Sequence, residues 1–438
     1  MNFGLAVLVG YSVLLVGFGA FMSRRVKKAD DFLVAGRALG PRLIAATFLA
    51  ANIGAGSTVG ATGLGYVYGF GAWWWVGCAG IGSFILANTV GPRIWALSAR
   101  NGWRTVGDFL DARYDRRVRG LVASVLWVGT PLILAGQLIA LARILEAIIG
   151  LQKWQGCVLG GIVVATYYVS GGLLSSVWVN AVQLTVKLTG FALAIPFGIA
   201  AAGGWRALQP AIHTSASLGA SGIGSYMVIL IPSFVVSPGL IQKLYAARDG
   251  RTVRIGVNIS AGVLLLFAFI PVILGVIVRS RFPALSGQEA ALPVLMTRVL
   301  PPWLGLLTLA AVFSAELSAS DVVLFMLSSS LSIDLYKTFL KPAASDRHLL
   351  AVTRLAAMAA AVFSIVLAIR LPSVIFALTL FYTLLAVALT APMVVGLYSR
   401  RPPAGRALVA VVSSVSAWAL TQSAPAGIVT GFVIMLLP

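Results

Sequence analysis

The sequence predicts an all-α polytopic membrane protein with 12 or 13 transmembrane helices, and three observations support this fold class. Of the 438 residues, 59% are hydrophobic and only 10% are charged, whereas soluble domains carry roughly 25% charged residues. Apolar runs close to the ~20 residues that cross a bilayer recur along the chain. These runs leave no stretch for a soluble domain, so we expect a lipid bilayer around the protein.

The apolar runs define thirteen candidate spans. The first has basic residues after it and none before it, which is typical of a retained helix with its N-terminus outside and not of a cleaved signal peptide. The last is short for a membrane span. In chain order, the predicted spans are 3–22, 41–65, 70–96, 120–149, 155–170, 176–202, 224–245, 254–278, 303–335, 350–370, 373–397, 405–421 and 425–437.

The net charge of +20 raises the question of a nucleic-acid partner. With the N-terminus outside, 24 of the 32 Lys and Arg residues fall in the links on the inner side. This asymmetry follows the positive-inside rule of multi-pass membrane proteins. The distribution of Lys and Arg therefore indicates how the chain is oriented in a cell inner membrane, and we expect no nucleic-acid partner.

Enzyme signatures are absent from the sequence. There is no HExxH and no GxxxxGK[ST], and the glycines of 54–60 have neither the spacing nor the preceding strand of a dinucleotide site. Cys78 and Cys157 lie in apolar spans without metal-ligand spacing, so we interpret them as buried small hydrophobes. We expect neither an enzyme nor a cofactor.

Helix breakers interrupt two of the predicted spans. The second span contains AANIGAGST (50–58), and the seventh contains IPSFVVSPG (231–239). Glycine and proline both weaken a helix interior. Irregular backbone at membrane depth persists only where protein or a water-lined cavity satisfies it.

The two interrupted spans are five spans apart, which predicts two repeats of five helices. Because five is odd, the second repeat is inverted relative to the first. The predicted organisation is an N-terminal helix and link (1–40), two repeats (41–202 and 224–397) and C-terminal helices (398–438). Matching breaks in inverted repeats favour a binding site at the midplane. The alternative interpretation is that Gly and Pro merely permit close packing.

Five segments, in the same order, resemble the sodium:solute symporter family: FLVAGRALGP (32–41), AANIGAGSTVGATGLGY (50–66), GGLLSSVWVNAVQ (171–183), PGLIQKLYAARD (238–249) and FSAELSASDVVLFMLSSSLSIDLYK (313–337). They extend over nearly the whole chain. The resemblance implies a ten-helix core of two inverted repeats and symport of a small solute with sodium by alternating access.

The resemblance also implies a sodium site between the second and ninth spans. Carried over by motif, its ligands are the backbone oxygens of Ala50, Ile53 and Ala311 and the hydroxyl of Ser314. This chain departs from the family where a second hydroxyl is replaced by Ala315 and an aspartate by Asn180. We expect Asn180 and Glu316 beside the ion, either as neighbours of its ligands or as a relocated anion.

Lys187 and Glu316 lie within predicted spans, where a charge costs ~2.5 to 3.5 kcal/mol on insertion scales. Three functional interpretations remain open. Glu316 is the relocated anionic partner of the cation, Lys187 holds a carboxylate-bearing solute, or the two relay a proton in place of sodium. A fourth interpretation is an ion pair that only fixes helix register.

We expect the solute to contact the two breaks. Family members that carry sugars have glutamine and glutamate where this chain has Ser57 and Val76, which favours a small organic acid or an amino-acid-like compound. Trp73, Trp74 and Trp75 are interpreted as anchors at the membrane interface. The expected solute contacts are Asn52, Ser57, Thr58, Lys187, Ser233 and Ser237. Two alternatives remain: a proton-coupled or uncoupled transporter of the same fold, and a transporter-like solute sensor.

Overall fold

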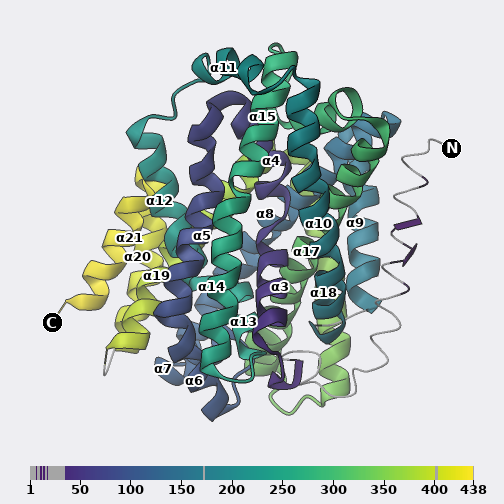
Figure 1. Ribbon diagram of the computed structural model, residues 1–438. Coiled ribbons are helices and arrows are strands. Elements are labelled where there is room, and N and C mark those ends of the chain that lie inside the picture. The colour runs from purple at the N-terminus through teal and green to yellow at the C-terminus, as the bar shows by residue number, and fades with distance from the viewer. Residues whose placement is uncertain are drawn as a thin grey trace.

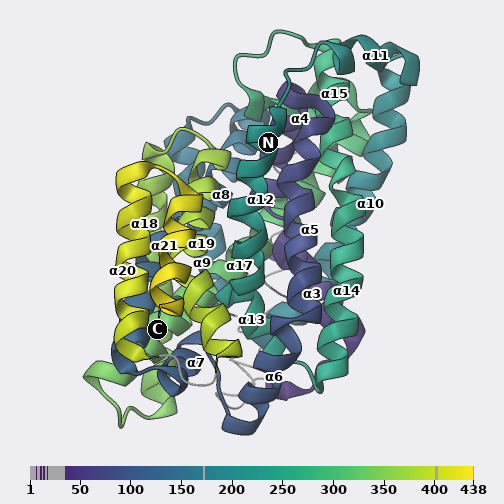
Figure 2. The ribbon, with the colours of Figure 1, turned by 90° about the vertical axis from the view of Figure 1, so that its left-hand side faces the viewer.

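The structure is a computed structural model that describes residues 35–170, 173–399 and 403–437, with a few positions before Ala35. Within these residues the chain is helical, with short links and no strand (Figure 1 and Figure 2). The predicted all-α fold is confirmed. Most of the predicted span 3–22 lies outside the described residues.

Helices of the first half follow the predicted spans closely. Across both halves, nine helical stretches among the described residues are long and apolar enough to cross a membrane. The elements of the first half are α3 (Pro41–Asn52), η2 (Ala55–Ser57), α4 (Val59–Tyr68), η3 (Gly69–Ala72), α5 (Trp73–Asn88), α6 (Val90–Asn101), α7 (Val106–Arg113), α8 (Arg116–Ile149), α9 (Lys153–Ser170) and α10 (Leu173–Ala201).

The second half repeats this arrangement after the short helix α11 (Trp205–His213). Helices α20 and α21 pack on each other and on α19, at the C-terminal edge of the molecule (Figure 1). The elements are α12 (Gly219–Val236), α13 (Pro238–Tyr245), α14 (Gly250–Phe267), α15 (Phe269–Arg281), η4 (Gln288–Ala290), α16 (Ala291–Val294), η5 (Leu295–Val299), α17 (Pro302–Ser329), η6 (Ser330–Leu340), α18 (Asp346–Arg370), α19 (Val374–Tyr398), α20 (Ala404–Thr421) and α21 (Ala424–Leu436).

Both predicted breaks are present. Helix α3 ends at Asn52, and Ile53 leaves the helical conformation with φ −97° and ψ 93° before α4 begins at Val59. Helix α12 ends at Val236, and Ser237 turns the chain with ψ 117° into α13. The core therefore consists of two inverted five-helix repeats whose first helices are interrupted.

The predicted span 70–96 is divided in the structure between α5 and α6, and the short helices α7 and α11 lie outside the predicted spans. Their signals are local ones, since Thr105 caps α7 and its hydroxyl accepts a hydrogen bond from the Asp108 amide. Asp115 caps α8 in the same way through the Val118 amide, which starts this helix four residues before the predicted span.

Arg119 joins three elements at the arginine-rich end of the molecule. Its guanidinium lies 2.8 Å from Asp108 and 3.1 Å from Asp111, both on α7, and 2.9 Å from Asp334 on η6. Thr105 also donates a 2.6 Å hydrogen bond to Asp334. The side chains of Arg119 and Asp334 are 8% and 7% exposed, so water has little access to this ion pair.

We predict that Arg119→Met lowers the free energy of unfolding by about 3 kcal/mol, because removing one member of a buried ion pair leaves an uncompensated charge. Thermal unfolding in detergent would measure the change. Arg117→Met, at an exposed neighbouring position, is the control and should shift stability by less than about 0.5 kcal/mol. Equal effects of the two substitutions would contradict the buried-pair explanation.

Glu289 contacts α8 and α19, at the end of α8 opposite to Arg119. Its carboxylate accepts a hydrogen bond from the Val374 amide at the start of α19, and it lies 3.7 Å from the Arg143 guanidinium on α8. Burial raises the pKa of Glu289, while the Val374 amide and Arg143 oppose that rise. A raised pKa means that the folded state binds this proton more tightly than the unfolded chain does.

We therefore predict that the contribution of Glu289 to stability is complete below its unfolded pKa and is lost as pH rises through its folded pKa. As pH rises above about 4.3, the pKa of an unfolded glutamate, the melting temperature of the wild type should fall more steeply than that of Glu289→Gln. Glu146→Gln, which removes the exposed partner of the same Arg143, is the control. Parallel curves for wild type and Glu289→Gln would refute the prediction.

Candidate functional site

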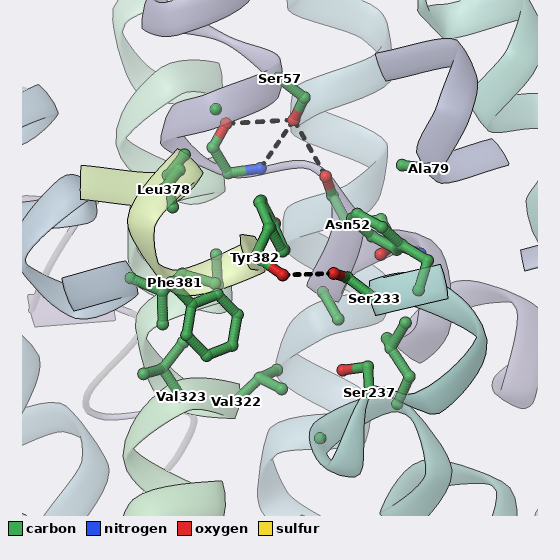
Figure 3. A pocket seen from close by; sticks show the side chains of 18 of the residues that line it. Asn52, Ser57, Ala79, Ser233, Ser237, Val322, Val323, Leu378, Phe381 and Tyr382 are labelled. Atoms are coloured by element: carbon green, nitrogen blue, oxygen red, sulfur yellow. Dashed lines mark hydrogen bonds between the residues drawn. The ribbon is translucent and has the colours of Figure 1, made fainter. Parts of the chain in front are cut away.

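A pocket lies where the two helix breaks face each other (Figure 3). Helices α5, α8, α17 and α19 complete its walls. The described lining contains no charged side chain. Its polar lining residues are Asn52, Ser57, Gln137, Ser233, Ser237 and Tyr382.

Side chains form hydrogen bonds with the backbone amide and carbonyl groups that the first break leaves without helical partners. The Ser57 hydroxyl lies 3.0 Å from the Gly54 amide and 3.0 Å from the Asn52 carbonyl oxygen (Figure 3). Gln137 on α8 accepts a 2.8 Å hydrogen bond from the Ala55 amide. Trp75 on α5 donates through Nε1 to the Gly56 carbonyl oxygen at 2.9 Å. The irregular segment is therefore held by its own Ser57 and from two other helices, α5 and α8.

The opposite wall combines a hydroxyl with aromatic rings. Ser233 Oγ lies 2.6 Å from both the Ile229 and the Tyr382 carbonyl oxygens, so it ties α12 to α19. The Trp75 ring packs edge-on against Tyr226, and Tyr382 packs against Phe234. This wall offers apolar surface to a solute and few free polar atoms.

Asn52 supplies a hydrogen-bond donor at the pocket. Its Nδ2 is buried and has no hydrogen-bond partner among the described residues. A buried donor without a partner costs free energy, and an acceptor group of a bound solute would recover it. Figure 3 shows Asn52 above Ser233 and Ser237, so the same solute could reach both breaks.

Four of the six predicted solute contacts line this pocket: Asn52, Ser57, Ser233 and Ser237. Thr58 and Lys187 do not line it. The Thr58 hydroxyl instead donates to Glu316 at 2.8 Å, behind the break. Lys187 reaches the break from α10, on the side away from the pocket lining.

The side-chain nitrogen of Lys187 contacts two of the predicted sodium ligands. Its Nζ lies 3.1 Å from the Ala50 carbonyl oxygen and 3.2 Å from that of Ile53, and it also bonds to Ser318 Oγ. Lys187 is fully buried. The other two predicted ligands are buried on α17: Ala311 packs against Gly190 of α10, and the Ser314 hydroxyl bonds to the Tyr11 hydroxyl.

Glu316 lies beside this position without pairing directly with Lys187. The two residues form no ion pair within 4.0 Å, although both are fully buried. Oε1 of Glu316 accepts from Thr58, and Oε2 has no hydrogen-bond partner in the described part of the chain. The interpretation of a direct ion pair that fixes helix register is therefore not supported. Among the described residues, no group of three or more His, Cys, Asp or Glu side chains could hold a metal ion.

Several site residues escaped the sequence analysis. Trp75 was interpreted as an interface anchor, but it is buried and donates a hydrogen bond to the Gly56 carbonyl oxygen in the first break. Ser318 was overlooked, although its place one helical turn after Ser314 indicates the same face of α17. Gln137 and Tyr382 carry no signal in the sequence, because their helices approach the break only in the folded protein.

The fold and this site define a secondary transporter in which two interrupted helices meet at a central pocket. The model of the sodium:solute symporter family matches residues 32–413. The chain therefore belongs to that family, whose members couple movement of small solutes to sodium, and it is a multi-pass membrane transporter and not an enzyme.

Individual relatives and structures agree with this assignment. The chain is 28% identical to the sodium/pantothenate symporter of Escherichia coli over 92% of this chain and 87% of that protein. It is 24% identical to the sodium/proline symporter of the same organism, over 82% and 75%. The structure of a substrate-bound, outward-open Na⁺-coupled sialic acid symporter superposes with a TM-score of 0.83 at 20% identity, covering 99% and 96%.

Gly54 permits the close approach of α17 and α8 to the break. A Cβ atom at this position would lie 2.5 Å from Ala319 Cβ and 2.8 Å from Gln137 Oε1. We predict that Gly54→Ala lowers the free energy of unfolding by about 1 to 3 kcal/mol through overpacking. Thermal unfolding would measure it.

Gly262→Ala on α14 is the matched control, because its Cβ would meet nothing within 4 Å. There alanine should raise stability by about 0.5 to 1 kcal/mol, as expected within a helix. If both substitutions changed stability in the same direction, close packing at Gly54 would not be the cause.

Proposed function

We propose that this protein is an inner-membrane symporter, with its N-terminus outside, that carries a small organic acid or an amino-acid-like solute through the central pocket. The observation that carries the proposal is the unpartnered Asn52 amide between two helix breaks. Relatives named for pantothenate and proline transport both act on carboxylate-bearing compounds. A pocket without charged side chains suits a solute of low net charge.

Transport would proceed by alternating access, with the segments Ile53–Thr58 and Ser237 as hinges between the repeats 41–202 and 224–397. Such a cycle requires the cation and the solute to favour the same conformation by differential affinity. We propose that the cation acts at the break of α3, with Ala50, Ile53, Ala311 and Ser314 as its ligands. Asn180 and Glu316 would serve as neighbours of that position.

We predict that purified protein in liposomes accumulates L-proline or pantothenate above the external concentration when a cation gradient is imposed. Asn52→Ala should lower uptake at subsaturating solute at least tenfold, which corresponds to about 1.4 kcal/mol, by raising the KM. Radiolabelled uptake is the measurement. Asn258→Ala is the control, since Asn258 pairs with Asn88 far from the pocket.

Accumulation also separates the transporter from a solute sensor of the same fold. A protein that binds either solute, seen as a rise in melting temperature, but never concentrates it in liposomes would be a sensor. That result would contradict the proposed function.

A further inference from the structure

A second cavity lies at the end of α8 opposite to Arg119. Its volume is about 560 Å³, which falls within the ~300 to 1,000 Å³ of pockets that bind small molecules. The last turns of α8, residues between 286 and 298 and the start of α19 form its walls. We call this space the outer cavity, because the proposed function places it on the outer side of the membrane.

The outer cavity lies beyond the central pocket along two shared helices. On α8, Gln137 lines the central pocket and Arg143 lines the outer cavity. These residues are six positions apart, which corresponds to ~9 Å along the helix axis. On α19, Leu378 lines the central pocket and Ser373 lines the outer cavity. The two spaces are therefore neighbours on the same side of the molecule.

Packed side chains separate the outer cavity from the central pocket. Ile375, between Ser373 and Leu378 on α19, packs against Gly60 of α4, where a Cβ would lie 2.7 Å from Ile375 Cδ1. A Cβ at Gly63, one turn further along α4, would lie 2.8 Å from the Gln288 carbonyl oxygen. A solute that moved from the outer cavity to the central pocket would have to displace Ile375.

Charged side chains of both signs line the outer cavity, in contrast to the central pocket. The Arg143 guanidinium lies 2.9 Å from Glu146 and 3.7 Å from Glu289. Both carboxylates of the cavity thus lie near one guanidinium. Arg298, an exposed lining residue, forms no ion pair within the described part of the chain. The charges balance in number, but their pairing leaves Arg298 without a carboxylate.

Two neighbouring atoms of the outer cavity also lack hydrogen-bond partners. The Glu289 side chain is 6% exposed, and its Oε2 lies 3.7 Å from Arg143 Nε. Neither atom has a hydrogen-bond partner among the described residues, because 3.7 Å is too long for a direct bond. A buried acceptor and a buried donor without partners each cost free energy. A ligand that supplied a donor for Glu289 and an acceptor for Arg143 would recover it.

We propose that the outer cavity is a second binding site of this transporter, for compounds that carry a carboxylate and an ammonium together, as amino acids do. The carboxylate binds Arg143 and Arg298, and the ammonium binds Glu289. The proposal rests on the proposed function, for which it supplies the site that an amino-acid-like solute occupies before it enters the central pocket.

The number of binding sites provides the first test. Equilibrium dialysis of radiolabelled L-proline against the detergent-purified protein in sodium chloride should show two molecules bound per wild-type chain. Asn52→Ala weakens the central site and so isolates the outer cavity. In that background, Arg298→Gln should lower the remaining affinity at least tenfold. Arg281→Gln is the control, because Arg281 is an exposed arginine shortly before the lining segment and does not line the cavity.

Two analogues test the charge pattern without changing the outer cavity. Propionate lacks the ammonium, and L-proline methyl ester lacks the carboxylate. Neither should displace labelled L-proline from the Asn52→Ala protein under conditions in which unlabelled L-proline displaces it fully. Displacement by propionate would reveal an anion site only, and displacement by the ester would reveal a cation site only. Either result would overturn the proposal.

Binding and uptake together separate this proposal from the proposed function. If the wild type binds one L-proline per chain and Asn52→Ala binds none, the outer site fails and the proposed function stands. If two molecules bind but neither L-proline nor pantothenate is accumulated in liposomes, the proposed function fails and the outer site stands. Equal binding by the Arg298→Gln and Arg281→Gln variants, or no binding of L-proline at all, would also overturn the outer site.

Discussion

A bilayer interior offers no water to a backbone, so each freed amide and carbonyl must find a partner within the protein. The break at Ile53–Thr58 leaves such backbone groups without helical partners at the centre of the molecule. Ser57, Gln137 and Trp75 satisfy the pocket side of the break, and Lys187 satisfies the side that faces α10. The arrangement of α5, α8, α10 and α17 follows from the need to bring these groups to one segment.

Small residues make this convergence possible. A Cβ at Gly190 on α10 would lie 2.6 Å from Ala311 Cβ on α17, so these two helices pack almost backbone to backbone. Gly54 and Ala319 show the same closeness between the break and α17. In a membrane, where apolar burial gives little driving force between helices, such contacts supply the packing energy. They also place Lys187 within reach of α3.

The sequence predicted the elements and the two breaks because hydrophobic length, Gly and Pro act locally. It also predicted four residues of the pocket, since Asn52, Ser57, Ser233 and Ser237 flank those breaks. The destination of the Lys187 side chain could not be predicted, because it depends on how closely α10 crosses α3. Trp75 was misread for a similar reason: an aromatic residue near the start of a span looks the same whether it faces lipid or an interrupted helix.

A hydrogen-bonding group that belongs to a side chain differs from a dissolved ion in one thermodynamic respect. Lys187 is bonded to its own helix, so its nitrogen stays next to Ala50 and Ile53 whatever the salt content of the medium. Mass action normally empties an ion site when the ion becomes scarce. Dilution cannot remove the Lys187 nitrogen, so the hydrogen bonds that join α10 to the end of α3 persist at any ion concentration.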